Sequence, residues 1–121
     1  MAKSKSVPSS AQIEEFANYI EHFQTLLNLR DWRIEASGKP AQKGAMADVM
    51  ISSDDRLAVW SIGRDWGAMP INTKTIKETS VHEVLHVFLR PLIEACKSRD
   101  ESAIQALEHS VIVVLEKLLS K

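Results

Sequence analysis

The segment SVHEVLHVFL, Ser80–Leu89, places two histidines and a glutamate inside an otherwise apolar pattern of helical spacing. Asn72 or Thr73 can cap the start of this helix, because a side-chain oxygen there accepts a hydrogen bond from the first turn. We expect the helix to end near Pro91, since proline lacks the N–H that a helix interior needs. The remaining elements are arranged around this helix.

Three strand candidates precede it along the chain. Apolar and polar side chains alternate over Trp32–Ser37, and this period of two is typical of a strand with one buried face. Ala45–Ile51 and Leu57–Ile62 are the other two candidates. Small and acidic residues, SSDDR, separate the last two candidates. They favour a turn and an antiparallel pair. The sequence therefore predicts a small three-stranded, mostly antiparallel sheet.

Two further helices complete the predicted fold. Ser9 or Ser10 can cap an amphipathic helix over residues 11–29, and Ser9 and Gln12 have the spacing of a capping box. We expect residues 1–9 to form a flexible arm. Ser98–Glu101, SRDE, is a second capping box and starts a helix that continues towards the C-terminus. The fold class is α+β, with helices covering one face of the sheet.

Length and composition narrow the classes of protein. The 121 residues, 45% of them hydrophobic, suit a single domain over residues 1–121. The net charge of −1 gives no general attraction to nucleic acid, and no basic stripe with interleaved aromatic residues is present. No apolar run approaches the length of a membrane span. The single cysteine and the lack of an apolar leader favour the cytoplasm.

The Ser80–Leu89 segment contains the pattern HExxH. His82 and His86 are four residues apart, so on a helix they lie about 40° apart around the axis and about 6 Å apart along it. Both imidazoles can therefore reach one metal ion. Glu83 projects about 100° from His82, where its carboxylate can take a proton from an activated water, and it is the predicted general base. The other reading is an accidental match in a helix that binds no metal.

A catalytic zinc site needs a third protein ligand. Glu108 is the main candidate, because an ideal helix places it at the centre of an apolar face made by Ile104, Val111, Ile112, Leu115 and Leu119. A carboxylate buried there costs several kcal/mol unless it is neutralised, paired or bound to a cation. Two alternatives stay open: Glu108 pairs with Arg90, or the helix is rotated and His109 is the third ligand.

These motifs resemble the small gluzincin-type zinc metallopeptidases, in particular the compact ImmA/IrrE-like and phage-encoded zincin-like proteins. The likeness rests on VHEVLHVFL, on a glutamate 22 residues beyond His86 and on the preceding strands DWRIEAS, ADVMI and LAVWSI. The segment VFLRP after His86 excludes the arrangement with a third histidine in an extended motif. Around Glu108, valine and leucine stand where that group often has small and aromatic residues.

The resemblance implies a minimal zincin-like metallopeptidase domain with one zinc ion per chain. It also implies a phage or bacterial origin, a host-cell cytoplasm, and a sheet whose last strand borders the active-site cleft and pairs with an extended peptide. The partners are then a protein or peptide substrate, and we expect a monomer or a weak homo-oligomer. Neither nucleic acid nor a membrane is an expected partner.

The predicted mechanism is hydrolysis of a peptide bond, with zinc on His82, His86 and Glu108, and with Glu83 as general base. Additional residues have the chemistry to orient a histidine or to stabilise the oxyanion: Glu78 for the first role, and Tyr19, His22, Arg64 and His109 for the second. The alternative is a non-catalytic zinc-stabilised domain that binds a protein. A metal-free adaptor with an accidental motif is the third hypothesis.

Overall fold

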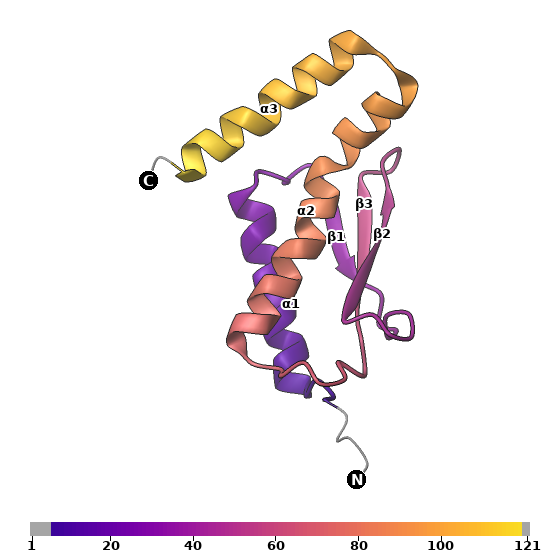
Figure 1. Ribbon diagram of the computed structural model, residues 1–121, viewed down its shortest axis with the longest axis vertical. Coiled ribbons are helices and arrows are strands. Elements are labelled where there is room, and N and C mark those ends of the chain that lie inside the picture. Colours follow the sequence, from indigo (N-terminus) through magenta and orange to yellow (C-terminus); the bar gives the residue numbers. More distant parts are fainter. Residues whose placement is uncertain (1–5, 120–121) are drawn as a thin grey trace.

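The computed structural model describes residues 6–119. In chain order its elements are α1 (Ser10–Leu26), β1 (Arg33–Ala36), β2 (Ala47–Ser52), β3 (Leu57–Ile62), α2 (Thr73–Ser98) and α3 (Glu101–Leu119) (Figure 1). The predicted α+β class, with one helix before three strands and two helices after them, is confirmed for this part of the chain.

The three strands form a mixed sheet in the order β1-β3-β2. β2 and β3 pair antiparallel through the turn after Ser52, as the SSDDR segment predicted. β1 and β3 pair in parallel, with Arg33 opposite Leu57. The prediction of a mostly antiparallel sheet was wrong, because one of the two strand pairs is parallel. After β1 the chain crosses to the opposite edge of the sheet and forms β2, and β3 then lies between β1 and β2. β3 is therefore central, and β2 is an edge strand.

Helices α1 and α2 lie side by side and cover one face of the sheet (Figure 1). The core lies in this interface. From β3, Ala58, Trp60 and Ile62 are buried, as the period of two requires. Phe16 of α1 packs against Trp60, with their ring centroids 5.1 Å apart. The helical layer contributes most of the other buried apolar residues, among them Ile20, Phe23, Ile76, Val84 and Val87.

The predicted caps at the starts of α1 and α2 are present. Ser9 and Gln12 make the reciprocal hydrogen bonds of a capping box at the start of α1. Asn72 caps α2 and exchanges the same pair of bonds with Thr75. These bonds fix where the helix that carries HExxH begins. His82 thus lies well inside a regular helix.

The predicted end of α2 near Pro91 was wrong, because the helix continues through Pro91 to Ser98. A proline inside a helix costs about 3 kcal/mol through a lost hydrogen bond and a steric clash. Val87 and Ala95, one turn before and one turn after it, are both buried, and their packing offsets this cost. Arg99 follows the last helical residue as the C-cap, with a left-handed φ of 58°.

Helix α3 turns back from this point and lies across the same end of the molecule as the C-terminal part of α2 (Figure 1). Its cap is Asp100, whose carboxylate accepts a hydrogen bond of 3.1 Å from the Ala103 amide. Ser98 was the predicted cap, but its hydroxyl donates to the Ala95 carbonyl within α2. The capping box was therefore misplaced, because α2 extends up to Ser98.

The N-terminal segment contacts the loop before α2. The Ser6 carbonyl accepts a hydrogen bond of 2.8 Å from the Trp66 amide, and Pro8 is buried. Of the expected flexible arm, residues 1–5 lie outside the described residues. Within residues 6–119, no helix combines the length and the apolar character that a membrane span requires.

Candidate metal centre

The two histidines of the HExxH pattern lie together on the surface of α2. Their Nε2 atoms are 3.2 Å apart, and the rings meet edge to face with centroids 4.8 Å apart. Both side chains are exposed. The predicted meeting of His82 and His86 is thus present in the structure.

This separation matches the needs of one tetrahedral ion. With Zn–N bonds of 2.0–2.1 Å, two nitrogen ligands of a tetrahedral zinc lie about 3.3 Å apart. The donor set, two imidazoles with open space around them, is also one that zinc accepts. A hydrogen bond from one neutral imidazole to the other gives a similar distance. The geometry fits zinc without requiring it.

Glu83 lies beside the histidines but on the inner side of α2. Its side chain is only 5% exposed, whereas the two histidines are exposed. Burial raises the pKa of its carboxyl group. His82 and His86 counter this in part, and the charge of Asp48 on β2 adds to it. Oε2 of Glu83 has no hydrogen-bond partner. A buried carboxylate in this state can accept a proton readily.

His82, Glu83 and His86, called the HExxH group below, each place one ligand atom within 4.8 Å of the others. Among residues 6–119 it is the one set of three or more such side chains close enough to hold an ion. Asp48 was not singled out from the sequence. The sequence does show an acidic residue within the otherwise apolar strand ADVMI. Only the packing of α2 against β2 shows that this residue, Asp48, lies near Glu83.

Glu108, the predicted third ligand, lies outside this group and is exposed on α3. The face of α3 that packs towards the body carries Ile104, Leu107, Val111, Val114 and Leu118, all half-buried. Glu108 directly follows Leu107 and so lies about 100° round the helix from it. The predicted position at the centre of the buried face is therefore wrong. Within the described residues, Glu108 and Arg90 form no ion pair.

The remaining predicted residues are spread over the molecule. His109 is exposed on α3. Glu78 is exposed one turn before His82 and lies 4.0 Å from the Lys74 ammonium. Tyr19 stacks on Phe23 within α1. His22 is exposed on the same helix, and Arg64 lines a separate cavity. None of them belongs to the HExxH group.

The sequence of HExxH thus produces a compact group of two imidazoles and one buried carboxylate on α2, with an acidic side chain nearby on the edge strand. Glu83 lies on the buried side of α2, as Val84 and Val87 do, whereas the two histidines are exposed. Comparison of the chain with models of protein families, with curated proteins and with solved structures found no match.

Proposed function

We propose that the protein is a zinc-dependent metallopeptidase that uses the HExxH group to hydrolyse peptide bonds. The observation that carries the proposal is the combination of an Nε2–Nε2 distance of 3.2 Å with a neighbouring carboxylate that is buried and incompletely hydrogen-bonded. Buried, unpaired ionisable groups are costly, and proteins retain them preferentially at functional sites. The edge position of β2 beside α2 supports a peptide substrate in extended conformation.

In this proposal His82 and His86 bind zinc through Nε2. The ion, when bound, would act as a Lewis acid and would lower the pKa of a water molecule to about 7. Glu83 would take a proton from the attacking water and would return it to the leaving amine. Its raised pKa suits both steps, because a base that titrates closer to neutral pH is also an effective acid.

Glu108 is the proposed third ligand, and it can reach the ion only if α3 packs against α2 in a different orientation. Ile112 and Leu115 are 43% and 39% exposed and flank Glu108 on the same side of the helix. Rotation of α3 by roughly 90° about its axis exchanges its present inner face for this second apolar face. Arg99, which has a left-handed backbone conformation, connects α2 to α3, and a change of its backbone angles would reorient α3.

A proteolysis assay with Glu83→Gln tests the proposal. The substrate is an unfolded model protein, and the zinc content of each variant is measured alongside. Glu94→Gln is the control, because Glu94 is an exposed glutamate on the same helix. We expect Glu83→Gln to retain zinc and to lose activity by at least about 100-fold, the typical contribution of general acid–base catalysis. Equal activity in wild type and Glu83→Gln contradicts the mechanism.

A second candidate function is a non-catalytic zinc site for binding another protein. It is favoured by the exposure of both histidines and by the position of Glu108 outside the group, because a partner's side chain then has access to complete the site. In this case zinc binding by His82 and His86 persists, while Glu83→Gln has no effect on the interaction. Zinc-dependent binding without proteolysis supports this candidate over the first.

A further inference from the structure

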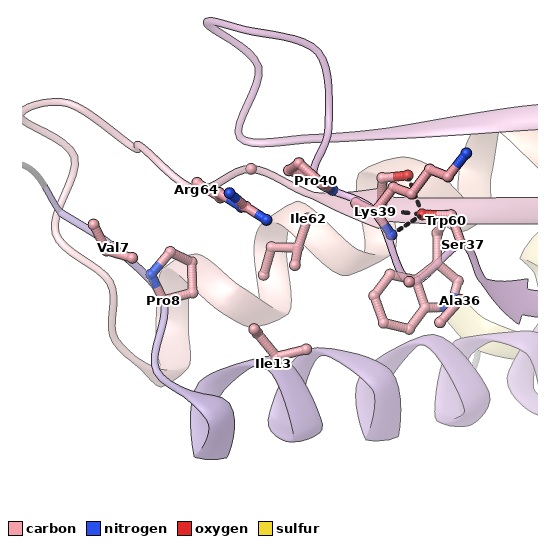
Figure 2. Close-up of a pocket in the computed structure, with 13 residues that line it drawn as sticks. Val7, Pro8, Ile13, Ala36, Ser37, Lys39, Pro40, Trp60, Ile62 and Arg64 are labelled. Carbon is pink, nitrogen blue, oxygen red and sulfur yellow. Dashed lines mark hydrogen bonds between the residues drawn. The ribbon is translucent and has the colours of Figure 1, made fainter.

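A cavity of about 230 Å³ lies where the N-terminal segment meets the ends of β1 and β3 (Figure 2). No member of the HExxH group lines it. Because β1 and β3 are parallel neighbours, their C-terminal ends lie side by side at one end of the sheet. The residues that follow them form one side of the cavity, and Pro8 and Ile13 form the other. The cavity is thus a separate feature of the fold.

Hydrogen bonds hold the walls of this cavity in place. The Ser37 amide donates to the Trp60 carbonyl and the Ala41 amide to the Ile62 carbonyl, at 2.8 and 3.1 Å. The hydroxyls of Ser37 and Ser61 lie 2.7 Å apart. On the opposite side, the bond between Ser6 and Trp66 and the capping box at Ser9 fix the N-terminal segment. A cavity with walls fixed in this way is preformed, as small-molecule sites usually are.

The lining combines an apolar floor with one positive charge at the mouth. Trp60, Ile62 and Ile13 provide the floor. Figure 2 shows the Arg64 guanidinium directed towards Ile62, whereas the Lys39 ammonium points away from the cavity. No acidic side chain from residues 6–119 lines the cavity, and none of the ion pairs in this part of the chain involves Arg64. The guanidinium is therefore available to an anionic group.

Volume and charge together define the class of ligand. A cavity of about 150 Å³ accommodates benzene, so 230 Å³ has space for one aromatic ring with a short chain. An arginine pairs well with a carboxylate through two parallel hydrogen bonds. We propose that this cavity binds a small aromatic monocarboxylate, with its ring on the floor formed by Trp60 and Ile62 and its carboxylate on Arg64. The proposal does not depend on the metal centre.

Titration of the full chain with 3-phenylpropanoate, in the presence of a chelator and followed by ¹H–¹⁵N NMR, tests the proposal. We expect saturable shifts at the Trp60 indole N–H and at the Ile62 amide. Arg64→Gln should weaken binding by at least about tenfold, because it removes the charge and the two parallel hydrogen bonds to the carboxylate. Arg30→Gln removes an exposed arginine that does not line the cavity and should leave the affinity unchanged.

Two further measurements separate the contributions of charge and volume. The uncharged amide of the same compound should bind about as weakly to wild type as the acid binds to Arg64→Gln. Ile13→Trp, which fills the cavity from α1, should abolish the shifts while the spectrum of the folded protein is retained. Absence of saturable binding to wild type overturns the proposal, and so does equal affinity of the acid for wild type and folded Arg64→Gln.

Discussion

Neutralising the buried carboxylate of Glu83 should stabilise the metal-free protein at high pH. The side chain is 5% exposed, and Oε2 has no hydrogen-bond partner. Leaving one buried polar atom unsatisfied costs about 1–3 kcal/mol, and more for a charged group. Glu83→Gln keeps the shape and removes the charge. Glutamine still leaves one polar atom unpaired, so the substitution removes only the additional cost of burying the charge. We therefore expect its free energy of unfolding at pH 8 to exceed that of wild type by about 1 kcal/mol or more.

The difference between the two proteins should depend on pH in a defined direction. Burial raises the folded-state pKa of Glu83 above the ordinary glutamate value of 4.5. The folded state therefore holds this proton more tightly than the unfolded chain does. Stability from this group is complete below pH 4.5 and is lost as the pH rises through the folded-state pKa. The advantage of Glu83→Gln should be small at pH 4.5 and grow towards pH 8.

Urea unfolding with a chelator present, at several pH values between 4.5 and 8, measures this difference directly. In thermal unfolding, each kcal/mol corresponds to about 4 °C in Tm for a chain of this size. Glu78→Gln is the control, because its exposed side chain should change stability by no more than about 0.5 kcal/mol at any pH. A Glu83→Gln protein that is no more stable than wild type at pH 8 refutes the reasoning.

Three further substitutions test the packing and the caps. Gly63→Ala should destabilise by at least about 1–3 kcal/mol in urea unfolding, the cost of overpacking, because the added Cβ meets the Ala45 carbonyl oxygen; unchanged stability contradicts the close approach. Asp100→Ala should cost about 1 kcal/mol through loss of the α3 cap, and a smaller loss than in Ser98→Ala would place the cap at Ser98. Glu108→Ala should leave metal-free stability within about 0.5 kcal/mol, and a gain of several kcal/mol would show that Glu108 is buried.

Local patterns predicted the elements well because their causes are local. The apolar segment Leu57–Ile62, which follows the turn residues SSDDR, predicted the bounds of β3, and the capping residues Ser9 and Asn72 located the starts of α1 and α2. The meeting of His82 and His86 also follows from helical spacing alone. In each case the deciding interaction joins residues close in sequence.

The errors arose where distant contacts decide. The helix passes Pro91 because tertiary packing at Val87 and Ala95 outweighs a local penalty. The parallel pairing of β1 with β3 depends on which edge the chain reaches, which alternation does not encode. The buried face of α3 shows this most clearly. Apolar residues occupy more than half of the circumference of this helix, so its sequence alone does not determine which side packs against the rest of the protein. Glu108 was placed on the wrong side for that reason.

The metal content of the purified protein tests the central claim most directly. Elemental analysis after dialysis against dilute zinc should give close to one zinc per chain for wild type. His82→Ala should lose the zinc, while His22→Ala should keep it, because His22 is an exposed histidine outside the HExxH group. No zinc in wild type, or equal zinc in wild type and His82→Ala, contradicts the assignment of the HExxH group as a metal centre.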